Sequence, residues 1–248
     1  MSKILEVNNL SKNYQTVNGE VKAIDNITFS LDNQEFVCIV GSSGCGKSTL
    51  LNILAGIDNK TSGDIKIKNG LKIGYMLQED ALFPWLNILD NACLGLNINH
   101  SKTNDNIEFV KGLLIKYGLK DFLDKYPHEL SGGMRQRVAL IRTLALKPDI
   151  LMLDEPFSAL DYVSRLKVSE DVSKIIKLEG KSVIMITHDI AEAISLADRV
   201  IVLSKRPGKV KKIYDISLKN LNSTFEKRNS KDFGYYYDLL WKEIDKDV

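Results

Sequence analysis

A chain of 248 residues, 44% of them hydrophobic, can bury a core of its own, either as one large α/β domain or as a domain with an added lobe. Its formal net charge of +2, from 34 basic and 32 acidic residues, argues against nucleic acid or an anionic membrane surface as the main partner. The longest apolar runs, such as ILML at 150–153, are far too short to span a bilayer.

The cysteines and the N-terminus bear on the compartment. Cys38, Cys45 and Cys93 have no metal-ligand spacing, and an odd number of cysteines in a chain of this length predicts reduced thiols in the cytoplasm. The first residues, MSKILEVNNLSKNY, lack the long apolar core of a signal peptide. If the protein works at a membrane, we expect another protein to hold it there.

The first part of the chain is rich in strand patterns. Strand-like runs separated by polar turns fill residues 4–40, and a helical pattern from 47 to 56 ends on Gly56, which suits a helix C-terminus. A short hairpin strand is expected at 63–70 and another strand at 73–78. These elements predict the start of an α/β domain.

Residues 88–126 read as three short helices with no strand between them. We therefore expect a helical lobe, about 86–130, inserted in the α/β domain. Buried strands and helices then alternate, which predicts a parallel sheet covered on both faces. The expected helices are 132–146, 162–180 and 190–198, and the expected strands are 149–155, 182–188 and 199–204.

The last part of the chain is expected to differ from the domain before it. The basic run at 205–212 is interpreted as a solvated hairpin, and the polar, aromatic segment at 224–248 as helical. The expected organisation is one domain at 1–220 and a C-terminal helical tail at 221–248.

The stretch GSSGCGKST at 41–49 fits the pattern G-x-x-x-x-G-K-[ST]. Glycines let backbone N–H groups point into one concavity, and the next helix adds its positive end, so the loop binds phosphates. Lys47 is expected at the β- and γ-phosphates and Ser48 at Mg²⁺. A Gly/Ser linker is the alternative, but a buried strand precedes the loop and a helix follows it. The expected nucleotide contacts are Gly41, Ser42, Ser43, Gly44, Cys45, Gly46, Lys47, Ser48 and Thr49, of which Ser43 and Cys45 fill the loop rather than supply chemistry.

Two carboxylates end the apolar run ILMLDE at 150–155. Asp154 lies at the tip of a buried strand, where a carboxylate can hold Mg²⁺, commonly through water. Glu155 follows at once and can poise an attacking water. Alone, the pair could be turn residues, but the phosphate loop favours a catalytic interpretation.

The string LSGGMRQRVALIRTLALKPDILMLDEPFSALD at 130–161 resembles the signature-to-D-loop region of ABC ATPases. Leu130 to Met134 match the signature LSGGQ except for the final Met. The resemblance extends over roughly residues 4–215, with five motifs in the family's order. In this comparison Gln78 resembles the Q-loop glutamine, Asp161 the D-loop aspartate, His188 the switch histidine, and Tyr14 the aromatic residue that stacks on adenine.

The resemblance implies a fold and a mechanism. The fold would be a P-loop NTPase with a RecA-like core, an antiparallel β-subdomain and an inserted helical subdomain. Two such chains, identical or paralogous, would meet head to tail. Each ATP, with Mg²⁺, would then lie between the phosphate loop of one chain and Ser131, Gly132 and Gly133 of the other.

The resemblance also implies individual roles. Glu155, His188 and Gln78 would be catalytic, His188 contacting the γ-phosphate or the attacking water. Ser48, Asp154 and Gln78 would hold or sense the metal. Simpler interpretations remain: Ser131 as a helix N-cap, His188 as a satisfied polar group, and Tyr14 as a packing residue.

A closer likeness lies in QEDALFPWLNILDNACLGL at 78–96, which resembles the nitrate, sulfonate and taurine importer ATPases, as does SKRPGKV at 204–210. An exposed apolar lip at Phe83–Leu86 would then receive a helix of a membrane permease. The alternative is that Trp85 is buried core. The chain departs from the group at Tyr162, where a small residue is expected, and in a short segment between Gly63 and Gln78.

These features predict a peripheral ATPase subunit on the cytoplasmic face of the membrane, serving an importer for a small solute such as nitrate, a sulfonate or taurine. A solute-binding protein would be an indirect partner and nucleic acid no partner. The rivals are a soluble ABC ATPase of DNA repair or translation, and a regulatory module without turnover. The short distance between Gln78 and Ser131 leaves no room for a coiled coil, and the presence of Glu155 and His188 argues against a module without turnover.

Overall fold

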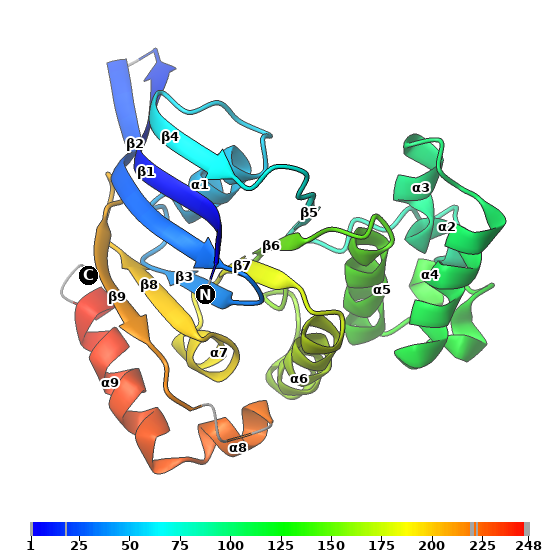
Figure 1. The fold of residues 1–248 in the computed structure, drawn as a ribbon. Coiled ribbons are helices and arrows are strands. Elements are labelled where there is room, and N and C mark those ends of the chain that lie inside the picture. Colours follow the sequence, from blue (N-terminus) through cyan, green and yellow to red (C-terminus); the bar gives the residue numbers. More distant parts are fainter. Residues whose placement is uncertain (1, 18, 219–220, 222, 246–248) are drawn as a thin grey trace.

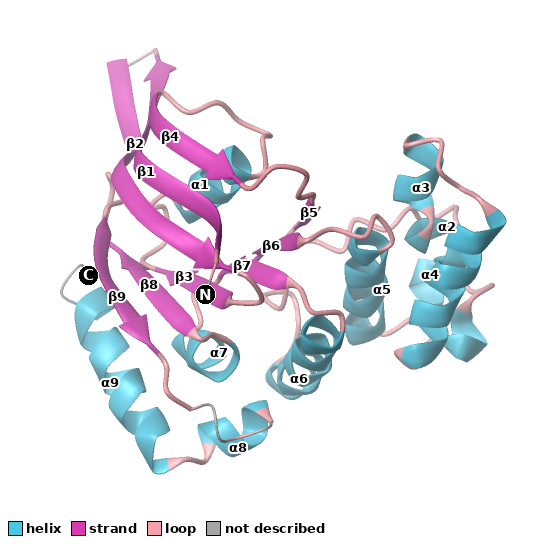
Figure 2. Ribbon diagram, in the orientation of Figure 1, coloured by secondary structure: helices cyan, strands magenta, loops and turns pink. Residues whose placement is uncertain are grey.

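Two sheets and a set of packed helices make up the computed structural model, which describes residues 2–17, 19–218, 221 and 223–245 (Figures 1 and 2). The smaller sheet lies on one side of the larger sheet, and most helices lie on the other side. The expected α/β class is confirmed.

The larger sheet has six strands in the order β5-β6-β7-β3-β8-β9. Its neighbouring strands pair in parallel except at one edge, where β8 and β9 are antiparallel. The sequence therefore predicted the parallel part correctly but not its antiparallel edge. The strands are β3 (Phe36–Val40), β5 (Ile73–Met76), β6 (Ile150–Asp154), β7 (Ser182–Ile186), β8 (Arg199–Leu203) and β9 (Val210–Asp215).

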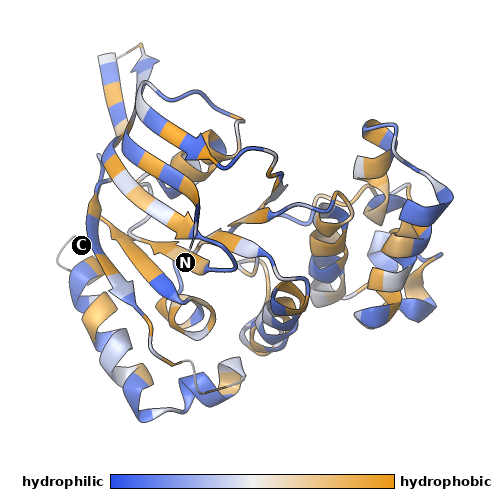
Figure 3. Ribbon diagram, in the orientation of Figure 1, coloured by the Kyte–Doolittle hydropathy of each residue, from blue (hydrophilic) through white to orange (hydrophobic). Residues whose placement is uncertain are grey.

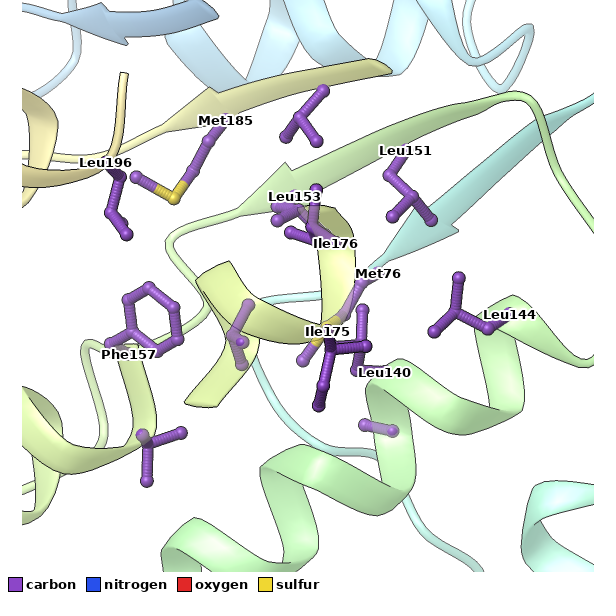
Figure 4. Packing of buried hydrophobic residues seen from close by; sticks show 14 of the residues in the cluster. Met76, Leu140, Leu144, Leu151, Leu153, Phe157, Ile175, Ile176, Met185 and Leu196 are labelled. Carbon is purple, nitrogen blue, oxygen red and sulfur yellow. The ribbon is translucent and has the colours of Figure 1, made fainter. Parts of the chain in front are cut away.

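The strands at the centre of this sheet are buried at every position and mostly apolar, as expected for a sheet covered on both faces (Figure 3). Alternate side chains point to opposite sides. One set, which includes Leu151, Leu153 and Met185, packs against the helices that carry Leu140 and Ile176 (Figure 4). Leu140 lies on α5 (Gly132–Leu144) and Ile176 on α6 (Tyr162–Leu178), and α7 (Ile190–Leu196) contributes to the same cluster.

The other face of the sheet is covered by one helix and the smaller sheet, with residues such as Ile39 and Met152 packed between them. The smaller sheet is antiparallel, in the order β2-β1-β4. The segment expected as a hairpin strand is β4, but it pairs with distant β1 instead of a sequence neighbour. The elements are α1 (Lys47–Leu54), β1 (Lys3–Thr16), β2 (Gly19–Asp32) and β4 (Ser62–Ile67).

The helical lobe lies beyond α5, away from the smaller sheet (Figure 1). Its buried residues, among them Ile88, Leu96, Val110 and Leu114, belong to the same apolar cluster as α5. The lobe therefore shares an apolar core with the main domain, and its side chains pack in the same cluster as those of α5. It consists of α2 (Ile88–Ala92), α3 (Leu94–Ile98), α4 (Asn104–Lys116) and the short turns η1 (Lys120–Phe122) and η2 (Pro127–Glu129).

The C-terminal tail forms two helices, α8 (Thr224–Arg228) and α9 (Lys231–Asp245), where one helical segment was expected. Its last expected residues, 246–248, lie outside the described residues. Buried Leu240 of α9 joins the main core, and the buried Lys227 ammonium donates to the Ser195 carbonyl, 2.9 Å away. The division of the chain at 220 stays a prediction. In the described part of the chain, no helix is long and apolar enough to cross a membrane.

Candidate nucleotide site

The phosphate loop connects buried strand β3 to helix α1. Gly46 stands just before the helix with a φ of 105°, a conformation that favours glycine. A Cβ at this position would lie 2.6 Å from Ile24 Cγ2, so the loop also needs glycine to fit beside β2. The loop is thus held open towards the helix N-terminus, where backbone N–H groups and the helix dipole favour anions.

The Lys47 side chain is buried and folds back along its own loop. Its ammonium donates to the carbonyls of Gly41 at 2.8 Å and Ser42 at 3.1 Å. The Cys45 thiol is buried beneath the loop, and burial raises its pKa. Lys47 lines the cavity, whereas the residues that contact its ammonium within the loop do not. Those residues are Gly41, Ser42 and Cys45.

Asp154 ends β6 beside the first turn of α1. Its Oδ1 lies 3.5 Å from Ser48 Oγ, and its Oδ2 lies 3.1 Å from the hydroxyl of Tyr75. Burial raises the pKa of the Asp154 carboxyl, and the hydrogen bond from Tyr75 opposes this shift. The Tyr75 hydroxyl also lies 2.8 Å from Asn52 Oδ1. The sequence analysis missed Tyr75, because no local pattern connects it to Asp154, 79 positions away.

Ser48 and Asp154 fit a magnesium ion. Mg²⁺ in phosphate-binding enzymes uses one or two protein ligands, and water and substrate phosphates supply the others. Within the described residues, no group of three or more His, Cys, Asp or Glu side chains could hold a metal. One hydroxyl and one carboxylate beside a phosphate loop match that kind of shared site.

Glu155 and His188 form a pair across the ends of β6 and β7. His188 Nδ1 lies 2.8 Å from Glu155 Oε2. Glu155 has a φ of 41°, unusual for a residue with a side chain, and its N–H donates to the carbonyl of Ile186 at 3.0 Å. A strained residue held this firmly is typical of a functional site.

A cavity of about 590 Å³ connects these groups, a volume within the usual range for small-molecule sites. It brings together expected residues from four parts of the chain. It also includes Val21, Ala23 and Arg206, which were not expected. The expected residues that line it are Tyr14, Ser43, Gly44, Gly46, Lys47, Ser48, Thr49, Glu155 and His188.

Tyr14 lies at the β-sheet end of this cavity. Its hydroxyl donates to Asp58 Oδ2 at 2.7 Å, and the Lys12 ammonium lies 4.6 Å from its ring centroid. Lys12 also pairs with Asp58 Oδ1 at 2.7 Å. The ring is therefore fixed in place at the cavity rather than buried in the β-lobe, which fits a platform for a planar base.

Gln78 and Asp161 lie outside the lining of this cavity. The exposed Gln78 amide donates to Ser158 Oγ at 3.2 Å, in the segment that precedes Asp161. Asp161 is the N-cap of α6 and accepts from the N–H groups of Val163 and Ser164. A hydrogen bond from the Ser164 side chain, together with those from these N–H groups, lowers the pKa of Asp161. Gln78 as a metal ligand stays a prediction.

The second glycine-led helix start, at α5, is also separate from the cavity. Ser131 is exposed and caps α5 by accepting from the Met134 N–H at 3.3 Å. Gly132 is partly buried. A Cβ at Gly133 would lie 2.6 Å from Val168 Cγ2, so packing against α6 requires that glycine. The sequence interpretation, which attributed both glycines to an approaching ligand, missed this packing reason for Gly133.

The apolar lip is exposed, and the alternative of a buried Trp85 is wrong. Trp85 is 69% exposed, and its ring stacks on Phe83 with centroids 5.0 Å apart. The fully buried Asn91 holds the turn beneath them. Its amide nitrogen donates to the carbonyls of Phe83 and Leu86, and its oxygen accepts from the Phe83 N–H. The hydrogen bonds of Asn91 therefore fix the backbone conformation of the lip.

Arginines of α5 connect the lip segment to the signature helix. Arg135 Nε lies 2.8 Å from Asp80 Oδ2, and the Arg142 guanidinium donates to the carbonyls of Asp80 and Ala81. These contacts join the residues after Gln78 to the helix that begins at Ser131. The segment that leads into the lip is therefore bonded directly to α5.

A phosphate loop, an acidic strand end and a histidine around one cavity define a P-loop nucleotide-binding protein. The family model described as ABC transporter matches residues 24–158. The chain belongs to the ABC transporter family. It is an ATP-binding subunit of such a transporter and an ATPase.

Named relatives cover nearly the whole chain. It is 40% identical to the taurine import ATP-binding protein TauB of Roseobacter denitrificans, over 93% of this chain and 90% of that protein. It is 38% identical to the nitrate import ATP-binding protein NrtD of a Synechocystis strain, over 95% of this chain and 93% of that protein. The uncharacterised ABC transporter ATP-binding protein YtlC of Bacillus subtilis is 40% identical, over 97% of this chain and 95% of that protein.

Solved structures confirm the expected fold. A dimeric ATP-binding cassette in a post-hydrolysis state, bound to ADP and Pi, matches with a TM-score of 0.73 and 30% identity. The match covers 86% of this chain and 98% of that one. The expected P-loop ABC ATPase fold is therefore correct.

Proposed function

We propose that this chain binds and hydrolyses ATP to energise the import of a small solute through a membrane permease, from the cytoplasmic face. The observation that carries the proposal is the pairing of Glu155 with His188 at the mouth of a phosphate-loop cavity that also contains Lys47. A module for nucleotide binding alone would need neither Glu155 nor His188.

The residues around the cavity have separate roles in this proposal. Lys47 and the backbone N–H groups of its loop bind the β- and γ-phosphates. Ser48 and Asp154 hold Mg²⁺, which neutralises charge on the phosphates when bound. Tyr14 stacks on the adenine.

Hydrolysis requires a water directed at the γ-phosphate. Glu155 accepts a hydrogen bond from that water and polarises it, and His188 contacts the γ-phosphate or the same water. The hydrogen bond between the two side chains fixes both at the carboxyl ends of adjacent strands. Their contribution is mainly positioning, which is the main requirement in phosphoryl transfer.

The complete site requires two chains. Ser131 lies outside the cavity that contains Lys47, on a different side of the sheet from the phosphate-loop helix. In a head-to-tail dimer, Ser131 and the N–H groups of Gly132 and Gly133 would reach the γ-phosphate bound by the partner, close to Asp161. The dimeric relatives of known structure support this arrangement.

The permease is proposed to dock on the lip at Phe83–Leu86. Exposed stacked aromatic rings on a rigid turn suit an apolar helix of a partner protein. The arginine contacts of α5 then transmit that partner's position to Ser131. Gln78, next to this segment, would report on both the metal and the permease.

Nitrate, sulfonates and taurine are the substrate candidates, since relatives at about 40% identity are named for them. The solute would be chosen by a binding protein and the permease. The alternative is a soluble ABC ATPase without a transport role. The lip favours transport, because a soluble factor has no need of a rigid exposed aromatic turn.

Two measurements test the proposal. Glu155→Gln with ATP should form a stable dimer by light scattering, whereas Lys47→Ala should stay monomeric. Chains co-expressed with the permease and receptor encoded beside this gene should import labelled nitrate, taurine or an alkanesulfonate, and Trp85→Ala should abolish that import. ATP-loaded Glu155→Gln that stays monomeric contradicts the shared site, and import that survives Trp85→Ala contradicts the lip as the docking site.

A further inference from the structure

Arg206 reaches the cavity from a part of the chain that the proposed function leaves unused. It lies in the turn between β8 and β9, and its Nε donates to the carbonyl of Gly44 at 3.2 Å. The two residues are 162 positions apart in the sequence. The basic run was interpreted as a solvated hairpin. The hairpin is present, but this interpretation of Arg206 is incomplete because its guanidinium lies against the phosphate loop.

The turn that carries Arg206 is fixed in place by its backbone. The Gly208 N–H donates to the carbonyl of Ala23 at 3.0 Å, and the Asp25 N–H donates to the Gly208 carbonyl at 2.9 Å. A Cβ at Gly208 would collide with the carbonyl oxygen of Cys45. The turn is thereby clamped between β2 and the phosphate loop, so Arg206 is positioned before any ligand arrives.

The charge of Arg206 is placed to act on a ligand. Its side chain is exposed at the cavity, and one of its five N–H groups binds Gly44. Lys47 and Arg206 are the lysine and arginine among the described residues that line the cavity, where Glu155 is the acidic residue. A guanidinium matches the geometry of phosphate oxygens and can bind two at once.

We propose that Arg206 is a second cationic nucleotide-binding residue, whose guanidinium contacts the phosphate chain of ATP and ADP while its Nε stays on Gly44. This inference rests on the proposed nucleotide site. It adds a contact from the β8–β9 turn, outside the phosphate loop and the acidic strand end. It also explains why the turn is clamped to the loop rather than left in solvent.

Four substitutions separate a charge contact from a structural clamp. Arg206→Ala removes both functions. Arg206→Gln retains an amide donor for Gly44 but loses the charge. Arg206→Lys retains the charge but loses the planar guanidinium that can bind two phosphate oxygens. Lys212→Ala is the matched control, because it removes an exposed cation from the same hairpin, where the ammonium lies over the ring of Tyr214.

The measurement is equilibrium binding of ADP and ATP labelled on the ribose, at low and at high salt. Arg206→Ala and Arg206→Gln should bind about tenfold more weakly at low salt. The difference should shrink at high salt, because screening weakens the ionic contact that the wild type makes. Arg206→Lys should be intermediate, and Lys212→Ala should match the wild type. Thermal unfolding without nucleotide should be equal for Arg206→Gln and the wild type.

Wild-type affinity in Arg206→Gln would overturn the inference and leave Arg206 as a clamp only. A loss that is the same at both salt concentrations would overturn it too, because the contact would not be ionic. Lys47→Ala, measured beside these variants, tests the site itself. If Lys47→Ala retains tight nucleotide binding, the proposed nucleotide site is wrong. If Lys47→Ala loses binding while the Arg206 variants bind nucleotide as the wild type does, only the inference about Arg206 is refuted.

Discussion

His188 Nδ1 lies 2.8 Å from Glu155 Oε2. A carboxylate only accepts hydrogen bonds, so the histidine must carry its proton on Nδ1. In the neutral imidazole, Nε2 then has a lone pair and cannot donate to a phosphate oxygen. His188 can therefore accept a hydrogen bond through Nε2. The Glu155 contact thus leaves Nε2 as the free ring nitrogen of His188.

The first prediction concerns Glu155. Glu155→Gln retains the size of the side chain but cannot polarise the attacking water, so we expect single-turnover hydrolysis to fall by roughly 10²- to 10³-fold. Nucleotide affinity should change little, because Lys47 and the loop remain. The measurement is rapid-quench hydrolysis with enzyme in excess, beside binding of labelled ATP. Turnover within twofold of the wild type would remove Glu155 from the chemistry.

Tyr75 supplies the second prediction. Its hydroxyl donates to Asp154, whose pKa is raised by burial, and so favours the ionised carboxylate that a metal requires. Tyr75→Phe loses about 1 kcal/mol of this stabilisation. The Mg²⁺ concentration for half-maximal ATPase activity should therefore rise about fivefold. Tyr14→Phe is the control: it should leave the Mg²⁺ requirement unchanged, and equal shifts in both variants would argue against a role for Tyr75.

The sequence predicts those parts of the site that are local. The phosphate loop, Asp154 and Glu155 are each defined by neighbours within a few residues, because a strand-loop-helix unit positions them. Tyr75 and Arg206 could not be found this way. Their partners lie 79 and 162 positions away, and only the order of strands in the sheet brings them together.

The fold shows the same division. Buried strands and amphipathic helices are recognised from local periodicity, and most were expected at nearly the observed positions. The pairing of β4 with β1, and the antiparallel β9 at the edge, depend on which strand edges remain free after the core has formed. The packing reason for Gly133 likewise depends on Val168, on another helix.

Gly133 gives the third prediction. Gly133→Ala should destabilise the protein by about 1–3 kcal/mol, because its methyl group overlaps Val168 Cγ2. Adding Val168→Ala should recover most of that loss in urea unfolding. ATPase activity of the double variant then separates the two explanations for this glycine. Normal activity assigns it to packing, and a stable but inactive double variant assigns it also to nucleotide contact.

The lip provides a matched pair of variants for the fourth prediction. Trp85→Ala alters an exposed side chain and should change the free energy of unfolding by less than about 0.5 kcal/mol. Asn91→Leu removes the hydrogen bonds that Asn91 makes to the Phe83 N–H and to the carbonyls of Phe83 and Leu86, and should cost about 2–4 kcal/mol. Both should weaken co-purification with the permease. Wild-type stability in Asn91→Leu would show that the turn does not depend on Asn91.

The fifth prediction concerns the buried Glu192, one helical turn past His188. Its Oε2 accepts from the Thr187 hydroxyl at 2.7 Å, and its Oε1 lies 3.7 Å from Arg165 Nε. Burial raises its pKa from 4.5 to about 7, with nearby Asp189 adding to the rise. The folded protein therefore binds a proton here that the unfolded chain releases between these two values.

The direction of the effect follows from that proton. Between pH 4.5 and 7 the folded state holds more protons than the unfolded state, so stability falls as pH rises. The full difference corresponds to roughly 3 kcal/mol. Glu192→Gln retains an acceptor for Thr187 but cannot ionise. The variant should therefore be about as stable as the wild type near pH 5 and more stable near pH 8.

Urea unfolding at both pH values measures this difference. Glu108→Gln, which removes an exposed carboxylate from α4, is the control and should follow the wild type. If Glu192→Gln lost as much stability as the wild type between the two pH values, Glu192 would already be ionised at neutral pH in the folded protein. The ion pair with Arg165 would then outweigh the cost of burial, and this buried charge would connect α6 to the segment that carries His188.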